Sequence, residues 1–482
     1  MGLFGILVSL FILIWLAYRG WSVLLLAPIG ALIAAAFAGE PLLAHWTQTF
    51  MGGASRFIAQ FFPIFLLGAL FGKLMDDSGS VTAIANFMAE KLGPRRAVLS
   101  VVLAGAFVTY GGVSLFVAFF VLAPMAQELF RKAGVPRRLA PAAIALGTST
   151  FTMSALPGTP AIQNAIPMPF FGTTAFAAPG LGVIASIIML VFGLWWLGRA
   201  EATARRKGEG YGDEASVHVD ATQDQAIRDR AATAREFDIA EIPHGHRGDS
   251  PNIFIAALPL IVVVAVNLVM SLIVLPRIDD GFLSEERWGP TTLAAVGGVW
   301  SVVVALAVAI VALILLNRSR LTQIRESVDS GVTASVLPAV SVASLVGFGA
   351  VVAAMPAFDM VRHWVLSIEG GPLVSLAIAT NVLASLTGSA SGGLTIALDT
   401  LGETYLRLAE KGGIDPALLH RVAVIGAGTL DSLPHNGAVV TLLAVCGCTH
   451  KESYLDIVVV AIVGAIVALC AVIALGSRFG SF

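Results

Sequence analysis

Charged residues are scarce in this sequence. Lys, Arg, Asp and Glu together supply 12% of its 482 residues, whereas hydrophobic residues supply 57%; roughly a quarter of a soluble domain is charged. Many stretches approach the ~20 apolar residues that cross a bilayer core of about 30 Å, and a water-soluble fold could not bury so many. The basic clusters are short, which argues against binding to nucleic acid. The sequence therefore predicts a multi-pass protein of the cell's inner (plasma) membrane, in contact with lipid.

Cysteines and strand-like patterns are also nearly missing. The three cysteines, Cys446, Cys448 and Cys470, lie in or beside apolar segments, and Cys446-Gly447-Cys448 lacks the spacing and companion ligands of a zinc or redox site. We therefore predict no metal site and no cofactor. No segment alternates apolar and polar residues as a strand does, and lipid admits only helices or closed barrels. We expect an all-α fold.

The apolar segments fall into two groups. Met1 to Leu16 has no basic region before its apolar run and no convincing Ala-x-Ala cleavage site, so it is interpreted as a first spanning helix. Because some segments are short, we expect about ten spanning helices. The predicted spans cover about 1–18, 21–39, 55–75, 96–110, 113–130, 138–155 and 176–198, then 252–275, 289–316, 333–355, 370–386, 391–408, 418–433 and 453–476.

A polar segment, 199–250, separates the two groups. It contains Arg205-Arg206-Lys207 and His244-Gly245-His246 but few large apolar residues, so it cannot support a core. We expect a flexible cytoplasmic loop here, between a first membrane repeat, 1–198, and a second, 251–482.

The two groups are related by a fixed offset of 277 positions. One gapless offset that matches glycines, prolines and hydroxyl residues indicates a duplicated membrane unit. Paired breaks in corresponding halves are the best sequence indication of a transporter's binding site. The matched pairs include Gly111 with Gly388, Ser114 with Ser391, Thr152 with Thr429, and Leu156-Pro157 with Leu433-Pro434.

Basic residues, which favour the cytoplasmic side, predict that the second copy is inverted. Basic clusters at 91–96 and 131–138 flank the spans 96–110 and 113–130, which therefore form a hairpin with its tip at Tyr110-Gly111-Gly112. Its arms are short for a crossing, so we expect a re-entrant pair. Five net crossings then precede the central loop, and this odd number turns the second half upside down. The second hairpin, 370–408, should open to the outside.

Four interrupted places recur as two pairs, and we expect them to form the binding site. They are the hairpin tips, 110–114 and 387–393, and the helix breaks, 155–160 and 431–437. Glycine lets the backbone approach a ligand closely, proline frees a carbonyl one turn back, and a restarting helix directs N–H groups at a ligand. Brought together at the midplane, these elements suit a small anion, above all a hydroxylated carboxylate. Close helix packing is the alternative role of each glycine and serine.

Asp431 and His435 are the ionisable residues of the second break, where the first copy has Ser154 and Gly158. An aspartate inside the bilayer costs about 2.5–3.5 kcal/mol on insertion scales, and histidine titrates near neutral pH, so both are candidates for proton coupling. Alternatively, Asp431 caps the restarting helix and His435 only donates a hydrogen bond to it. For Asp399, on the second hairpin, we expect a structural role.

Phe71-Gly72-Lys73-Leu74-Met75, both hairpin tips and both helix breaks resemble the gluconate permease family. These are proton symporters for sugar acids and other hydroxycarboxylates, within the broader ion-transporter superfamily. The resemblance covers most of the chain outside the central loop. It implies an inverted repeat with two re-entrant hairpins, a homodimer, and coupling to protons.

The first break departs from gluconate transporters, which carry a His-Pro-Gly-Pro type motif there. This chain has Leu156-Pro157-Gly158-Thr159-Pro160, and a histidine–asparagine pair stands instead in the second break, between Ser432 and Ala438. The pattern is more similar to the branch that carries 3-hydroxybutyrate and related short acids. Carried over by position, the anion-facing residues are Ser114, Thr159, Asn164, Ser389, Ser391 and Asn436, beside the tip glycines Gly111, Gly112 and Gly392.

We therefore expect a secondary active transporter, not an enzyme, that imports a small hydroxy-monocarboxylate such as gluconate or 3-hydroxybutyrate by proton symport. The alternatives are a sodium-coupled carboxylate symporter and a sodium–proton antiporter that uses Asp431 and Asp399 as alternating ligands. An intramembrane hydrolase with Ser389 or Ser391 and His435 is a third class, but nothing in the sequence fixes a base beside a nucleophile.

Overall fold

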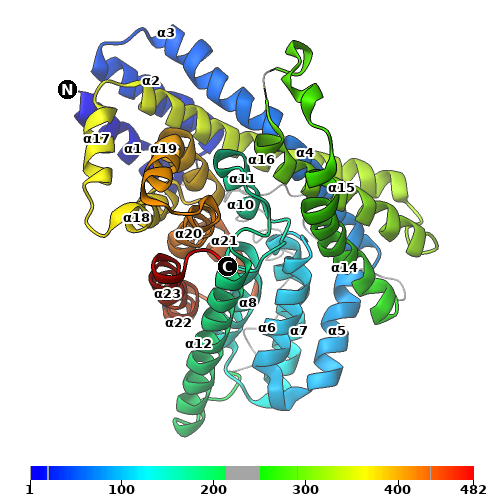
Figure 1. Cartoon of the computed structure of the whole chain (residues 1–482). Helices are drawn as coiled ribbons and strands as arrows, with labels where there is room; N and C mark the ends of the chain where they lie inside the picture. Colours follow the sequence, from blue (N-terminus) through cyan, green and yellow to red (C-terminus); the bar gives the residue numbers. More distant parts are fainter. Residues whose placement is uncertain (1, 19–20, 213–249, 290, 435) are drawn as a thin grey trace.

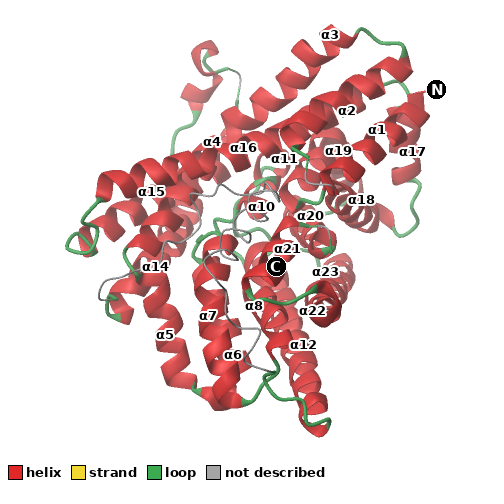
Figure 2. Cartoon of the chain, turned by 180° about the vertical axis from the view of Figure 1, so that it is seen from behind, coloured by secondary structure: helices red, strands yellow, loops and turns green. Residues whose placement is uncertain are grey.

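The computed structural model describes residues 2–18, 21–212, 250–289, 291–434 and 436–482, and within these ranges the chain is helical and contains no strand (Figure 2). The predicted all-α fold is confirmed. The first half comprises α1 (Gly2–Tyr18), α2 (Val23–Ala38), α3 (Leu42–Ala44), α4 (Met51–Asp77), α5 (Ser80–Leu92), α6 (Ala97–Tyr110), α7 (Leu115–Ala133), α8 (Ala140–Thr148), α9 (Phe151–Ser154), α10 (Ile162–Ala165), α11 (Pro167–Phe171) and α12 (Pro179–Arg206). The second half comprises α14 (Ile253–Val269), α15 (Leu293–Leu316), α16 (Ile324–Ala354), α17 (Phe358–Leu366), α18 (Gly371–Thr387), α19 (Ala390–Gly412), α20 (Pro416–Thr429), α21 (Gly437–Val445), α22 (His450–Ile457) and α23 (Gly464–Phe479).

Large apolar side chains lie on the outside of this fold. Phe254 is 80% exposed, Leu315 68% and Phe11 65%, values that would be costly in water but are ordinary against lipid tails. Lipid also offers the backbone no hydrogen-bond partner, so each apolar run satisfies its own amides and carbonyls as a helix. The protein is therefore a multi-pass membrane protein.

Six helices among the described residues are long and apolar enough to span a membrane. The bent pair Ser80–Leu92 and Pro94–Tyr110, which turns by 100°, would make a seventh. The expectation of about ten also counted shorter apolar helices, such as Gly2–Leu13 and Val23–Ala38, so the number of full crossings stays a prediction. The six are Leu42–Asp77, Pro179–Arg206, Ile253–Arg277, Leu293–Leu316, Ile324–Ala354 and His450–Phe479.

The helices of the two halves follow the offset of 277 positions found in the sequence. Shifted by this offset, α4, α6 and α7 would occupy 328–354, 374–387 and 392–410, and the structure has α16, α18 and α19 at these places. The correspondence extends to α5 and α17, two helices that link a long helix to a hairpin. The two halves are therefore duplicated in structure as well as in sequence.

Helices α4 and α16 pack side by side in opposite directions (Figure 1). Gly53, near the start of α4, lies against Ala350 near the end of α16, and Gly331, near the start of α16, lies against Lys73 near the end of α4. The offset of 277 relates Lys73 to Ala350, and it relates Gly53 to position 330, which is next to Gly331. The contact of Gly53 with Ala350 and that of Gly331 with Lys73 are therefore equivalent. A pseudo-two-fold axis that relates antiparallel copies produces this pairing. The predicted inversion of the repeat is confirmed.

The two hairpins open at opposite ends of α12, a helix of 28 residues that is about 42 Å long. Near its C-terminal end, Arg205 donates a hydrogen bond to the carbonyl of Ala133, where α7 of the first hairpin ends (3.3 Å). Near its N-terminal end, Pro179 lies in the same surface pocket as Asp415, which follows the second hairpin. The hairpins α6–α7 and α18–α19 therefore enter the fold from opposite sides, as predicted.

An ion-pair cluster joins the two halves at the end of α12 where the central segment begins. Arg138 donates to Glu209 (2.7 Å) and to Asp456 of α22 (2.8 Å), and Trp196 donates to the other oxygen of Asp456 (2.9 Å). The bond from Arg138 lowers the pKa of Glu209 below its usual value. Most of the predicted loop 199–250 lies outside the described residues, and the three-part division of the chain stays a prediction.

The helices α5 and α17 lie outside the spans predicted from the sequence. α5 and α17 are short and carry charged residues such as Glu90, Lys91 and Arg362, so a search for long apolar runs passes over them. α12 also continues eight residues beyond the predicted end at 198. Charged residues show where α5, α17 and the end of α12 lie outside the apolar spans. These segments are helical nevertheless, so a charged residue does not mark the end of a helix.

We predict that Lys132→Cys and Lys411→Cys face opposite sides of the membrane, because their hairpins open at opposite ends of α12. Both lysines are exposed, and a Cys470→Ser background removes the exposed native cysteine while Cys446 and Cys448 stay buried. A membrane-impermeant maleimide added to intact cells should label Lys411→Cys and spare Lys132→Cys until the cells are opened. Labelling of both positions from one side would contradict the inverted repeat.

Candidate functional site

The tip of the first hairpin lies against the first helix break. The hydroxyl of Tyr110 donates to the carbonyl of Pro157 (2.7 Å), and Gly112, with φ of 98°, packs against Pro160 so closely that a Cβ would lie 2.7 Å from its ring. Asn267 of α14 donates to the carbonyl of Gly158 (3.1 Å). Proline and glycine free these carbonyls from helical pairing, and side chains from two elements, α6 and α14, satisfy them.

The tip of the second hairpin lies against the second break in the same manner. The side-chain amide of Asn436 donates to the carbonyl of Gly388 and to the carboxylate of Asp431, both at 2.9 Å. Its oxygen accepts from the backbone amide of Ala438 (2.8 Å) and so caps α21. The backbone amide of Ala390, at the start of α19, lies near the carboxylate of Asp431. One aspartate and one asparagine thus join hairpin tip, break and restarting helix.

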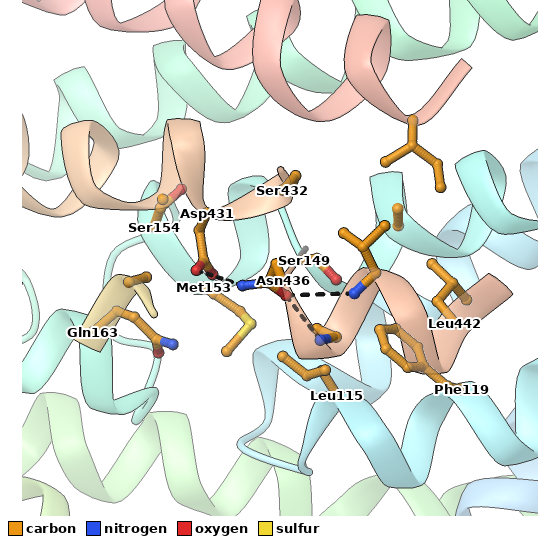
Figure 3. Close-up of a pocket in the computed structure, with 16 residues that line it drawn as sticks. Leu115, Phe119, Ser149, Met153, Ser154, Gln163, Asp431, Ser432, Asn436 and Leu442 are labelled. Carbon is orange, nitrogen blue, oxygen red and sulfur yellow. Dashed lines mark hydrogen bonds between the residues drawn. The ribbon is translucent and has the colours of Figure 1, made fainter. Parts of the chain in front are cut away.

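A small cavity lies between the two halves at these breaks (Figure 3). Its volume is about 40 Å³, enough for one or a few water molecules. Its polar wall is formed by Ser149, Ser154, Gln163, Asp431, Ser432 and Asn436, and its apolar wall by side chains that include Leu115, Phe119, Met153, Val439, Leu442 and Ile457. Both halves therefore contribute to one site, as the paired breaks predicted.

Of the residues proposed from the sequence, Asp431 and Asn436 line this cavity. Ser114 and Ser389 instead cap α7 and α19, by accepting from the backbone amides of Phe116 (3.4 Å) and Gly392 (3.2 Å). The helix N-termini expected to receive an anion are thus occupied by the protein's own side chains in this conformation. The roles proposed for these residues stay predictions.

The other proposed positions lie around the cavity without forming its wall. Gly111 packs against Leu260 of α14, Thr159 is fully buried, and the hydroxyl of Ser391 lies 3.2 Å from that of Ser389. His435 lies outside the described residues. Asp399, for which we expected a structural role, is exposed on α19, and that role stays a prediction.

Asn164 points away from the cavity into a buried polar network. Its amide donates to the carbonyls of Thr159 (3.1 Å) and Ala175 (3.0 Å). Its oxygen accepts from His420 (3.1 Å) and Arg421 (3.4 Å), both of α20 and both fully buried. Asn164 therefore fixes the first break to the second half and does not face the cavity in this conformation.

Arg421 extends this network to the backbone of the first break. It donates to the carbonyls of Ser154 (3.2 Å) and Ala177 (2.7 Å), and Gly182 lies against its guanidinium group, where a Cβ would come within 3.3 Å. Our sequence reasoning missed Arg421 and His420, although an arginine inside a predicted span is a signal in itself. It also missed Gln163, Ser149 and Met153 on the cavity wall.

The chemistry available here is the binding of a small polar solute beside one carboxylate. Among the described residues no group of three or more His, Cys, Asp or Glu side chains could hold a metal ion. Ser389 and Ser391 bond each other and the start of α19, an arrangement that caps a helix.

We predict that Asn164→Ala destabilises the fold, because it removes two hydrogen bonds to backbone carbonyls and the two that the buried His420 and Arg421 make to its oxygen. The expected loss is about 1–3 kcal/mol, measured as a lower midpoint of thermal unfolding in detergent. Asn381→Ala is the matched control, since Asn381 makes a single bond to a carbonyl of its own helix (2.8 Å). Equal losses in both variants would show that the network does not hold the first break.

Comparisons with known proteins agree with this architecture. Residues 1–206 match the sequence model of the GntP family permease. The chain is 39% identical to the uncharacterized transporter YxjC of Bacillus subtilis over 100% of both chains. It is also 33% identical to the high-affinity gluconate transporter of Escherichia coli over 141 residues, which is 28% of this chain and 31% of that protein.

A solved structure shows a similar fold. MtrF of Neisseria gonorrhoeae, from a class of antimetabolite efflux pumps, matches 91% of this chain and 85% of its own with a TM-score of 0.52 at 14% identity. This likeness concerns the fold alone. The full-length relative and the family match lead to one conclusion: the chain belongs to the GntP family of permeases and is a membrane transporter.

Proposed function

We propose that this transporter imports a small hydroxy-monocarboxylate together with a proton, and that Asp431 carries the proton. The observation that supports it is the position of Asp431, which lines the cavity between the two breaks, accepts a hydrogen bond from Asn436 and lies near the amide of Ala390. The relationship to a gluconate transporter over part of the chain supports an organic anion as substrate.

Asp431 occupies the place that an anionic substrate would take. Its carboxylate lies near the amide of Ala390, the first residue of the 23-residue helix α19, and a helix N-terminus favours negative charge. Ala390 also lines the cavity. A protonated Asp431 is a weaker acceptor and frees this amide, so the carboxylate of the substrate can replace it.

The same geometry couples the proton to the anion. Two carboxylates that share one small site repel each other, and such pairs bind one proton between them. Binding of the anion therefore favours a protonated Asp431, and a proton gradient drives the anion inward. The net charge of the loaded site equals that of the empty site, which suits movement through lipid.

A proton suits these contacts better than sodium does. Sodium is bound by oxygen acceptors, whereas the groups that face the carboxylate of Asp431 are N–H groups, from Asn436 and from the nearby amide of Ala390. Asp399, the second ligand of the sodium–proton alternative, does not line the cavity at which Asp431 lies. Proton symport is therefore the function that the geometry supports best.

Alternating access would follow from the division of the fold. The antiparallel pair α4–α16 forms a frame with α2, α14 and α15, and the two hairpins with the broken helices form a second body. Movement of this second body against the frame would expose the breaks first to one side and then to the other. The homodimer implied by the resemblance is part of this proposal, and the mass of the purified protein in detergent tests it.

The proposal is tested by uptake into proteoliposomes that contain the purified protein. Gluconate, 3-hydroxybutyrate, lactate and citrate are compared as substrates, with and without sodium, under an inward proton gradient. Uptake of a monocarboxylate with proton entry and without a need for sodium is expected. Uptake that requires sodium, or proton movement driven by sodium with no acid present, would establish one of the alternatives.

We predict that Asp431→Asn abolishes accumulation while exchange continues. The asparagine keeps the size of the side chain and an oxygen acceptor beside Asn436, but it binds no proton, so substrate crosses only down its own gradient. With a gradient of one pH unit, the wild type should accumulate a monocarboxylate up to about tenfold, and the variant should not exceed equilibrium. Counterflow of labelled substrate should persist in the variant.

Asp399→Asn is the matched control for this change. It alters an aspartate on the second hairpin that lies outside the cavity, so accumulation should equal that of the wild type. If Asp431→Asn accumulates substrate normally, or if Asp399→Asn loses accumulation instead, Asp431 is not the proton carrier.

A further inference from the structure

Gln163 holds a buried polar atom that the fold leaves without a partner. Its side chain lines the cavity, and its Oε1 atom is buried yet accepts no hydrogen bond among the described residues. The neighbouring Asn164 has every polar atom engaged in the network with His420 and Arg421. Of these two adjacent amide side chains, Asn164 is therefore fully hydrogen-bonded, whereas Gln163 has an unpaired oxygen.

An unpaired buried acceptor destabilises a protein, and most such groups have partners. The surrounding structure does not require a polar side chain at position 163, because apolar side chains such as Met153, Leu115 and Phe119 form other parts of the same cavity wall. A leucine or methionine at position 163 would fill similar space without an unpaired atom. The glutamine is therefore best explained by a partner that arrives with the solute.

The chemistry of that partner follows from the atom that is unpaired. An amide oxygen accepts hydrogen bonds and cannot bond a carboxylate, which has no proton to donate, whereas a hydroxyl group donates. The carboxylate end of a substrate would lie at Asp431, Asn436 and Ala390, as proposed above. Figure 3 places Gln163 beside Met153 on the side of the cavity that Asp431 faces.

We propose that Gln163 recognises the hydroxyl group of the substrate and so distinguishes hydroxy acids from unsubstituted acids of the same length. This inference rests on the proposed function, because it assumes a carboxylate at the second break. The two breaks then divide the recognition between them. The second break binds the charge, and Gln163 of the first break binds the hydroxyl.

The test compares hydroxy acids with their deoxy counterparts in the Gln163→Leu variant. Competition of labelled 3-hydroxybutyrate uptake by unlabelled 3-hydroxybutyrate and butyrate gives one preference ratio, and lactate with propionate gives a second. A site built to bond a hydroxyl discriminates strongly against an analogue that lacks it. We expect the wild type to prefer the hydroxy acid by about tenfold or more, the effect of one hydrogen bond, and Gln163→Leu to reduce this ratio to near one.

Two controls separate recognition from structure. Met153→Leu changes the shape of the same cavity without removing a polar atom, so both acids of a pair should be affected alike. The midpoint of thermal unfolding should not fall in Gln163→Leu, because the Oε1 atom makes no bond within the protein, whereas a structural role would lower it.

The outcomes are distinct. If the wild type takes up none of the acids, the proposed function is wrong and this inference fails with it. If the wild type takes up hydroxy acids and Gln163→Leu keeps the same preference ratio, the proposed function stands and the role of Gln163 is wrong. A lower unfolding midpoint in Gln163→Leu, with both acids weakened equally, would show that Gln163 is structural.

Discussion

Backbone groups that lose their helical partners inside a membrane must find partners within the protein, because lipid offers none. The broken helices and hairpin tips of this chain depend on that constraint. Ser114, Ser389 and Asn436 cap the helices that restart, while Tyr110 and Asn267 donate to carbonyls of the first break. Polar side chains are thereby gathered at one place between two apolar halves. The cavity lies where these groups meet.

The two duplicated halves differ in the charged residues at their helix breaks, although the breaks themselves correspond in position. Asp431 corresponds by the offset to Ser154, and Arg421 corresponds to Ile144. The first break is fixed by a buried cation and its carbonyl partners, and the second break carries the carboxylate that faces the cavity. An inverted repeat supplies equivalent geometry on both sides of the membrane, and the substitutions that break its symmetry supply the charge that transport needs.

Much of the fold could be predicted, because lipid reduces the choices of a chain to helix length and helix direction. The offset of 277 and the basic flanks of the first hairpin predicted the repeat and its inversion, which the antiparallel contact of Gly53 with Ala350 confirms. The helices α5 and α17 could not be found in this way, since they are short and charged. Within the site, the two breaks and Asp431 were predicted, whereas the direction of Asn164 was not.

The sequence by itself determined the helical class, the duplication and the places where helices break, because hydrophobic runs, glycine and proline act on the local backbone. Only the tertiary structure decided which side chains of a break face the cavity. Residues 163 and 164 are adjacent amides with the same chemistry, and a rotation of about 100° per residue along a helix directs one to the cavity and the other to Arg421. That choice depends on how helices far apart in the chain pack together, which no local pattern records.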